Sequence, residues 1–396
     1  MPSPPTSEPV DPRTLPISSD LAKRLSSHVA YLASPDLRGR RPGTPGNQQA
    51  AQYIRDFFVH VGLEPLGSLG GYTQSISPTI GDNLIGVRRA RTPHARERWV
   101  LVGAHYDHLG ATDGTIYPGA DDNASAVAIL LETACVMAPL CRYSLAFVAF
   151  NAEEPPFIRT PLMGSQYFVD HLPAEMSSPD QFQAVLIMDL MGGVHWVPLC
   201  QTVFVAGAEQ SPPLYRHVKH LATVHEARSL LSIRPIGMHV IEQIPLLGRT
   251  PFSDYDAFRN AAIPYAFFSS GRTPRYHQPT DLPDTIYYER MAATVWWFHD
   301  LLHSIDQDDL PYTFDPHRIE FADELATFRP LIAQAANWDT RIPGTSYVSW
   351  LKLRQDAQWA ARVNPSHPTQ QDITRLERAS LRMQCLLADI PVAFLL

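Results

Sequence analysis

Apolar residues along this chain follow two patterns, a helical spacing near both ends and short continuous runs between them. Segments 18–34 and 46–63 carry apolar residues every three or four positions, which predicts two amphipathic helices. The Gly- and Pro-rich stretch between them predicts a loop. Six later segments are short and rich in branched or aromatic side chains, which predicts strands. These segments are 83–90, 98–104, 144–150, 184–190, 201–208 and 263–270.

Helical segments alternate with these strands. Residues 124–138 are apolar on most faces and therefore predict a buried helix, and 211–224 and 287–305 are predicted helices as well. Alternation of strands and helices is typical of a parallel sheet covered on both faces. The sequence therefore predicts an α/β fold, with a mostly parallel mixed sheet between two layers of helices.

The pattern changes near residue 306. Three helical segments follow, separated by Pro- and Gly-containing turns, and none of them resembles a strand. We predict one α/β domain over 18–305 and a helical C-terminal extension over 306–396 that packs on it. Residues 1–17 are rich in Pro and Ser, which predicts a disordered tail. The helical segments of the extension are 321–339, 346–363 and 370–390.

Composition narrows the possible partners and location. The net charge of the 396 residues is −8 and no block of like charge stands out, so we expect neither nucleic-acid nor membrane binding. The longest apolar runs are far shorter than the ~20 residues that span a bilayer. The N-terminus shows no secretory signal, and the four cysteines are irregularly spaced, which favours a reducing compartment. We therefore expect a cytoplasmic protein; its oligomeric state stays open.

Side chains that bind metal ions follow several predicted strands. Each has a simpler explanation, such as a hydrogen-bonded pair, a helix N-cap or a solvated turn. Asp189 is harder to explain, because an unpaired carboxylate in an apolar run costs several kcal/mol unless a positive charge meets it. Ligands bind outside the carboxyl ends of strands in open α/β sheets. The candidates are His105, Asp107, Asp122, Glu153, Glu154, Asp189 and His277.

The types of these residues indicate which metal they suit. Two histidines and three carboxylates without cysteine form an N/O ligand set, which suits zinc first and other first-row cations second. Five ligands are too many for one catalytic zinc, but they suit two metals about 3.5–4 Å apart that share one carboxylate. Of the adjacent Glu153 and Glu154, one can bind metal while the other accepts a proton.

The motifs GAHYDHLG, PGADDNASA, FNAEE, MDLMG and YHQPTDLPD occur in this order, after GRRPGTPGN and YIRDFFVHVGLEPLG. Together they resemble the dinuclear zinc aminopeptidase family, which includes bacterial leucyl aminopeptidases, plasma glutamate carboxypeptidase, the glutaminyl cyclases and the transferrin receptor ectodomain. The resemblance covers residues 21–305 and implies that 18–305 is a metallopeptidase catalytic domain. It implies two Zn²⁺ per chain and release of N-terminal amino acids from peptides with a free N-terminus.

The resemblance also implies a distribution of metal ligands. His105 and Asp189 would hold one zinc, and Glu154 and His277 would hold the other. Asp122 would bridge the two ions, because it aligns with the bridging position of the family motif. The neighbouring Asp121 is an alternative, since the sequence alone does not separate the two residues.

Further roles follow from the same resemblance. Glu153 would be the general base for a metal-bridging water, and Asp107 would hydrogen-bond His105. Tyr276 would help to stabilise the tetrahedral intermediate. We expect Asp281 behind His277, where it would orient the ring. His108 is expected to be a bystander at the rim of the site.

Two rival functions remain at this point. A glutaminyl cyclase-like acyltransferase would use a single zinc, and a binding scaffold would not catalyse a reaction at all. Substrate preference is open too. Arg272 and Arg275 lie near His277 in sequence and could receive a substrate carboxylate, although solvated loop residues are the simpler explanation. Three aromatic residues could line an apolar pocket, but core packing explains at least two of them more simply. They are Phe252, Tyr255 and Phe258.

Overall fold

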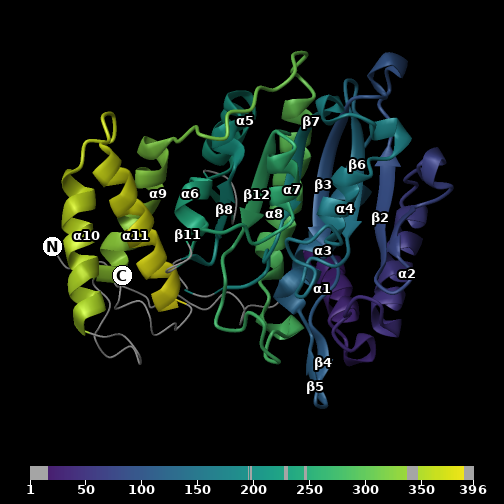
Figure 1. Ribbon diagram of the computed structural model, residues 1–396, viewed down its shortest axis with the longest axis horizontal. Coiled ribbons are helices and arrows are strands. Elements are labelled where there is room, and N and C mark those ends of the chain that lie inside the picture. Colours follow the sequence, from purple (N-terminus) through teal and green to yellow (C-terminus); the bar gives the residue numbers. More distant parts are fainter. Residues whose placement is uncertain are drawn as a thin grey trace.

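One eight-stranded sheet runs through the protein and carries the helices on its two faces (Figure 1). The computed structural model describes residues 17–194, 196, 199–226, 231–244, 248–336 and 347–387. Nearly all of the predicted N-terminal tail, residues 1–16, lies outside the described residues. No helix in the described ranges is both long and apolar enough to cross a lipid bilayer.

The strands follow the order β1-β2-β6-β3-β7-β12-β8-β9 across the sheet. The four central strands, β6, β3, β7 and β12, are parallel, while β2 and β8 flank them in antiparallel pairing. The sheet is therefore mixed and mostly parallel, as predicted. The carboxyl ends of its four central strands lie side by side at the same end of the sheet. The strands are β1 (Thr73–Ser77), β2 (Gly81–Arg88), β3 (Trp99–His105), β6 (Ser144–Phe150), β7 (Phe182–Met188), β8 (Thr202–Ala206), β9 (Ser232–Pro235) and β12 (Tyr265–Ser269).

All six predicted strands are present, but the two edge strands were missed. Every residue of β3, β6 and β7 is buried, which explains why the sequence marks these strands as apolar runs. At one edge, β1 reads TQSIS and is only partly buried, and at the other edge β9 has four residues. Edge strands face solvent along much of their length and need few apolar residues, so the hydrophobic pattern does not reveal them.

Two hydrophobic cores lie on opposite faces of the sheet. Val100 and Val102 of β3 join the core under the helices of one face, whereas Trp99 and Leu101 of the same strand join the other. This alternation follows from side chains that point to opposite faces along a strand. The first core packs under α1 (Asp20–Leu32), α2 (Pro45–His60), α3 (Ala126–Val136), α5 (Pro212–Glu226) and α8 (Tyr288–Ile305). The second packs under α4 (Gly164–Asp170), α6 (Met238–Ile241) and α7 (Tyr255–Asn260).

The buried helix predicted over 124–138 begins later than expected. Regular helix α3 starts at Ala126, and residues 120–125 form a kinked turn in which Asp122 and Asn123 lie outside helical φ/ψ values. The Asn123 side chain donates to the carbonyl of Met188 (3.1 Å) and accepts from the amide of Leu190 (3.2 Å), both at the end of β7. These bonds hold the turn against the sheet edge, so tertiary contacts override the helical pattern here.

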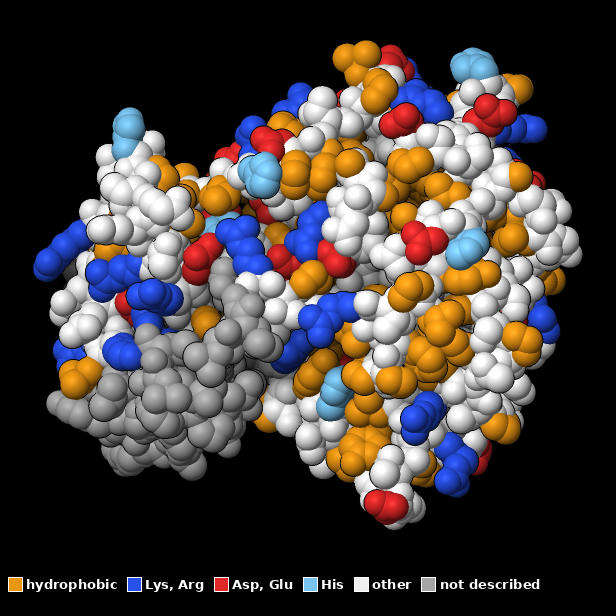
Figure 2. Space-filling view, in the orientation of Figure 1, with side chains coloured by type: hydrophobic (Ala, Val, Ile, Leu, Met, Phe, Trp, Pro, Cys, Tyr) orange, Lys and Arg blue, Asp and Glu red, His pale blue; other side chains and the backbone are white. Residues whose placement is uncertain are grey.

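The helical C-terminal extension continues the second core beyond strand β9. The Thr327 hydroxyl donates to the carbonyl of Pro235 (2.7 Å), and His239 of α6 lies 2.9 Å from both Glu324 and Glu377. Figure 1 places the extension at the opposite end of the molecule from α2, and Figure 2 shows Lys and Arg side chains gathered over it. Its helices are α9 (Phe321–Ala336), α10 (Tyr347–Arg362) and α11 (Gln370–Leu387). The predicted ends at 337–339 and 388–390 lie outside the described residues.

Candidate metal centre

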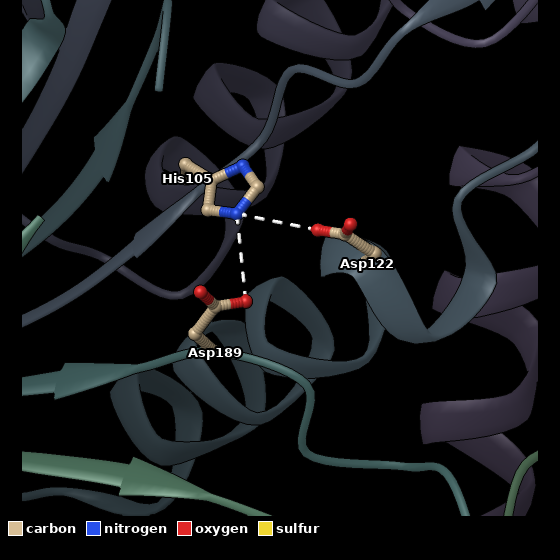
Figure 3. Close-up of side chains that lie close together, drawn as sticks. All are labelled: His105, Asp122 and Asp189. Atoms are coloured by element: carbon tan, nitrogen blue, oxygen red, sulfur yellow. Dashed lines mark ion pairs between the residues drawn. The ribbon is translucent and has the colours of Figure 1, made fainter. Parts of the chain in front are cut away.

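Three buried side chains meet where strands β3 and β7 end, as Figure 3 shows. His105 is the last residue of β3, Asp189 follows β7 directly, and Asp122 comes from the kinked turn before α3. Nε2 of His105 lies 3.5 Å from Oδ1 of Asp122 and 3.6 Å from Oδ1 of Asp189. The structure therefore brings together the three residues that the sequence suggested for one metal position, each with a donor atom facing the same space.

A second group shares Asp122 with the first. It contains His108, Asp122 and Glu154, all buried, and His277 approaches the same carboxylates. Nε2 of His277 lies 3.1 Å from Oε2 of Glu154 and 3.3 Å from Oδ2 of Asp122. The two oxygens of Asp122 thus face different groups, Oδ1 toward His105 and Oδ2 toward His277. Two adjacent groups that share one carboxylate are consistent with a dinuclear metal site.

His108 does not lie at the rim, contrary to the prediction from sequence. Its side chain is completely buried, and Nδ1 lies 2.8 Å from Oε1 of Glu154, a hydrogen-bond distance, and 3.8 Å from Oδ2 of Asp122. The chain turns inward after β3, and the backbone amide of His108 bonds to the carbonyl of Arg40 (3.4 Å). The His-Tyr-Asp-His spacing was the available signal, but only the path of the loop shows where the second histidine points.

Asp281 does not lie behind His277 to orient its ring, so that prediction from the sequence was wrong. Its carboxylate accepts hydrogen bonds from the backbone amides of Asp121 (2.9 and 3.0 Å) and Asp122 (3.1 Å). Those amides begin the kinked turn before α3. Amides at the start of a helix have no hydrogen-bond partner within the helix, and together with the helix dipole they favour a negative charge. Asp281 therefore holds the turn that presents Asp122.

Asp121 is occupied by the backbone of the loop after β7. Its Oδ1 accepts from the amides of Gly192 and Gly193, both at 2.8 Å. A Cβ at Gly193 would collide with this carboxylate, so the close approach requires glycine there. Because Asp121 points toward this loop, Asp122 is the aspartate that faces both His105 and His277.

Asp107 ties the end of β3 to the turn after β6. Its carboxylate accepts from the backbone amides of Glu153 (3.1 Å) and Glu154 (3.2 Å), next to Ala152 with φ 59°. Oδ1 of Asp107 lies 3.6 Å from Nδ1 of His105, and that nitrogen is 3.3 Å from the backbone carbonyl of Asp107. Asp107 therefore acts on both glutamates as well as on the histidine.

The two adjacent glutamates have opposite electrostatic environments. Burial raises the pKa of Glu153 well above its usual value, and the charges of Glu154 and Asp189 raise it further against the opposing effect of His105. Burial also acts to raise the pKa of Glu154, but close contacts with His108 and His277 and the charges of these rings outweigh it and lower that pKa. Glu153 is therefore the carboxylate suited to hold a proton, and Glu154 is the one held as an anion.

The carboxylates also control the histidines. Burial acts to lower the pKa of His277, but contacts with Asp122 and Glu154 outweigh it and raise the pKa to about 10. In the same way Glu153, Asp107 and Asp189 overcome burial at His105 and raise its pKa. In the metal-free protein these rings therefore carry protons that neutralise part of the negative charge, and a bound cation would replace those protons.

Unpaired polar atoms in the centre test whether a metal fits. A buried donor or acceptor without a partner costs about 1–3 kcal/mol. Within the described ranges, several donor atoms of the two groups are buried and make no hydrogen bond, and they face one another. Nitrogen and carboxylate oxygen are donors that suit zinc. These atoms are Nε2 of His105 and His277, Oδ2 of Asp122 and Oδ1 of Asp189.

Two buried arginines brace the loops of the site, and sequence reasoning missed both. Arg40 donates to the carbonyls of Tyr106 (2.9 Å), Pro118 (2.7 Å) and Gly119 (3.0 Å), on either side of the β4–β5 hairpin (Gly110–Thr112 and Thr115–Tyr117). Arg290 of α8 bonds the carbonyls of Met191 and Gly193 in the loop after β7. In the sequence, Arg40 is marked only by its place in a Gly- and Pro-rich loop, and Arg290 only by its place in a largely apolar helix.

Asp254 is a further buried carboxylate that the sequence reading passed over. Neither of its oxygens makes a hydrogen bond within the described part of the chain, and burial raises its pKa to about 7. It adjoins Ser253, whose hydroxyl donates to Oδ2 of Asp189 (2.9 Å). The available signal in the sequence was the polar pair Ser253–Asp254 within the aromatic-rich segment TPFSDYDAF. Asp254 therefore belongs to the carboxylate cluster around His105.

Aromatic side chains lie beside the second group. The ring of Tyr276 stacks on His277 with centroids 3.8 Å apart, and the Arg272 guanidinium lies 4.6 Å from the Tyr276 ring. The ring of Phe252, which is half-buried, lies 5.4 Å from the same guanidinium. Tyr255 and Phe258 are fully buried in the second core, so core packing explains them as expected.

Known proteins share this fold. The uncharacterized protein YfbL of Escherichia coli (strain K12) is 27% identical over 290 residues, which cover 69% of this chain and 85% of that protein. BSAP, a zinc aminopeptidase from Bacillus subtilis, has a similar structure, with a TM-score of 0.54 at 16% identity over 74% of this chain and 98% of that chain. A glutaminyl cyclase of Fimbriiglobus ruber gives a TM-score of 0.55 at 20% identity over 74% and 98%.

The family is decided by the sequence rather than by these distant structures. A profile described as peptidase family M28 matches residues 83–302, more than half of the chain. The matched region runs from β2 to α8 and includes both groups of metal-binding side chains. The chain therefore belongs to peptidase family M28.

Proposed function

We propose that this protein is a zinc-dependent aminopeptidase that removes N-terminal residues from peptides. The carrying observation is that Asp122 faces His105 with one oxygen and His277 with the other, while Oε2 of Glu153 lies 3.8 Å from Nε2 of His105. A carboxylate that is shared between two groups of ligands suits two cations. Glu153 lies beside these groups but belongs to neither of them, so it is available for proton transfer.

Each metal position has its own residues in this proposal. His105 and Asp189 would hold one Zn²⁺, Glu154 and His277 would hold the other, and Asp122 would bind both. His108 would keep Glu154 in place through its bond to Oε1. Bound zinc would supply Lewis acidity, which polarises a carbonyl and lowers the pKa of water.

Glu153 would carry the proton of the reaction. Its buried carboxylate accepts a proton from the attacking water as the new C–O bond forms, and it delivers that proton to the leaving nitrogen as the C–N bond breaks. The raised pKa supports this role, because a carboxylate with a raised pKa accepts a proton more readily than an ordinary one. Asp107 positions Glu153 by binding its backbone amide. Tyr276, stacked on His277, is proposed to stabilise the oxyanion of the intermediate.

The charge of the site supports removal of residues from the N-terminus. Within the described chain, Asp122, Glu153, Glu154, Asp189 and Asp254 are buried carboxylates around it. Zinc would balance Asp122, Glu154 and Asp189, so Glu153 and Asp254 are left to accept a charge-assisted hydrogen bond from a free α-amine, whereas an acylated nitrogen carries no charge. Charge-assisted hydrogen bonds contribute about 1.5–3 kcal/mol each, so the free amine is expected to be a main determinant of cleavage.

A comparison of a short peptide anilide with its N-acetylated twin tests this function. We expect the free peptide to be hydrolysed at least roughly 10–100-fold faster, since acetylation removes at least one charged contact. The release of the chromogenic amine measures both rates. Activity should disappear on chelation and return on addition of Zn²⁺.

Other outcomes point to the rival functions. Equal cleavage of both peptides would contradict an aminopeptidase. If neither is cleaved, the zinc content decides, because one zinc together with cyclisation of an N-terminal glutamine would indicate a glutaminyl cyclase. No bound zinc and no turnover would indicate a binding scaffold.

The zinc stoichiometry of two histidine variants tests the second metal position. Replacing His277 with alanine should reduce zinc from about two ions to about one per chain, because Nε2 of His277 is a proposed ligand. The matched variant His108→Ala should keep two ions while the weaker site binds about 10–100-fold less tightly, the usual effect of losing a residue that orients a ligand. Atomic emission on dialysed protein measures both. The opposite result would make His108 the ligand.

A further inference from the structure

Arg272 lies close to two aromatic rings next to the candidate metal centre. Its guanidinium carbon lies 4.6 Å from the centre of the Tyr276 ring and 5.4 Å from that of Phe252. Phe252 is itself anchored on the second core through edge contacts with Tyr255 (5.5 Å) and Phe267 (5.6 Å). Tyr276 stacks on His277. The guanidinium is therefore one aromatic ring away from a proposed zinc ligand.

The positive charge of Arg272 is not paired with a carboxylate in the described part of the chain. Within the described ranges no carboxylate lies at ion-pair distance from it, and its side chain is exposed. Its loop is well ordered by hydrogen bonds, including Ser270 N to the carbonyl of Leu190 (2.9 Å) and Tyr276 N to that of Thr273 (3.0 Å). The ordered loop and the two nearby rings restrict the guanidinium, which lowers the entropy lost when it binds an anion, and its planar fork matches a carboxylate.

The distribution of charge assigns a direction to a bound peptide. In the zinc-loaded enzyme Glu153 and Asp254 are buried carboxylates near His105 that hold no proposed metal, and they favour the α-amine end of a peptide. Arg272 offers a cation without a carboxylate partner in the described chain, on the far side of the Tyr276 ring from His277. A peptide with its N-terminus at the carboxylates can present a negative group from its leaving portion to this guanidinium.

We propose that Arg272 binds a carboxylate on the leaving side of the scissile bond and thereby selects short peptides with a free C-terminus or an acidic second residue. This inference rests on the proposed function for the direction of the substrate. The ligand chemistry is the same in both cases, a carboxylate on the forked guanidinium. Arg275, three positions later, stacks on no ring in the described chain and provides a matched control.

Two substrate pairs distinguish the sources of the carboxylate. Leucylglycine against leucylglycinamide tests the C-terminus, and leucylglutamate α-amide against leucylglutamine amide tests the side chain. In the parent enzyme we expect kcat/KM to favour the acid of at least one pair. Arg272→Gln should reduce that acid-to-amide ratio about 30-fold, largely through KM. Arg272→Lys should reduce it less because the charge remains, and Arg275→Gln should leave it unchanged.

Calorimetry separates this inference from the proposed function. The zinc-loaded Glu153→Gln protein, with and without Arg272→Gln, is titrated with leucylglycine, leucylglycinamide and the second pair, so binding is measured without turnover. Tighter binding of an acid that disappears with Arg272→Gln supports the carboxylate site even if no peptide is hydrolysed. Equal binding or no binding of acid and amide, or a ratio that survives Arg272→Gln, overturns it.

Discussion

Replacing Glu153 with glutamine is expected to lower kcat for peptide hydrolysis by about 10²–10⁴-fold, the usual contribution of a general base. Glutamine keeps the shape of the side chain but cannot accept the proton of the attacking water. Glu153 is buried beside His105 and belongs to neither of the two groups of three that suit a metal ion. The zinc content and the melting temperature should therefore stay close to those of the parent protein.

The neighbouring glutamate provides the matched control. Glu154→Gln removes one negative charge from the same turn, but from a carboxylate that lies 2.8 Å from His108 and 3.1 Å from His277. This variant should lose zinc as well as activity. Steady-state kinetics combined with metal analysis separates the two effects. Full activity in Glu153→Gln, or loss of zinc from it, would remove Glu153 from its proposed role.

Removal of metal is the second change with a large expected effect. Chelation should abolish hydrolysis and lower the melting temperature, because zinc that binds only the folded state stabilises it by about 4 kcal/mol at 1,000 times its Kd. The stabilisation should grow as the pH rises from about 6 to about 8. Zinc must displace protons from the site, so its affinity rises about tenfold per pH unit for each proton released.

The direction of this pH dependence follows from the metal-free centre. Contacts with Asp122 and Glu154 raise the pKa of His277 to about 10, above the usual 6.5, despite its burial. The stabilisation from that protonated ring is complete below pH 6.5 and is lost as the pH rises through about 10. The metal-free protein thus loses this contribution over the range in which zinc binding strengthens. Thermal denaturation with zinc and with chelator, at several pH values, measures the difference.

A variant without the shared carboxylate is the control for this experiment. Asp122→Asn weakens both metal positions at once, since each oxygen of Asp122 faces a different histidine. Zinc should then change the melting temperature little at any pH. A parent protein whose zinc-dependent shift stays constant between pH 6 and 8 would show that protons and metal do not compete at these side chains.

Much of the site was predictable because buried parallel strands have a clear sequence pattern. The strands β3, β6 and β7 are buried at every residue. His105 ends β3, Asp189 follows β7 directly, and the Glu153–Glu154 pair comes shortly after β6. The carboxyl ends of neighbouring parallel strands meet at one edge, so the order of these residues already implied that they converge. Asp122 was predictable from its family motif.

Contacts between distant loops were not predictable in this way. Asp281 follows His277 closely in sequence, yet its carboxylate binds the amides of residues 121 and 122, far back along the chain. His108 is buried against Glu154 because of the path of one loop. Arg40 and Arg290 bond to backbone carbonyls, which have no sequence signature. Polar side chains in loops can choose among many partners, and local sequence does not rank them.

The sequence by itself thus determined the fold class, the six apolar strands and most of the side chains that converge at the carboxyl ends of the central strands. The tertiary structure alone decided the edge strands, the kink before α3, the partners of Asp281 and His108, and the approach of Arg272 to two aromatic rings. The physical reason is the range of the forces involved. Periodic burial of apolar side chains is encoded locally, whereas the partner of a polar group depends on which distant segments the packed core brings within hydrogen-bonding reach.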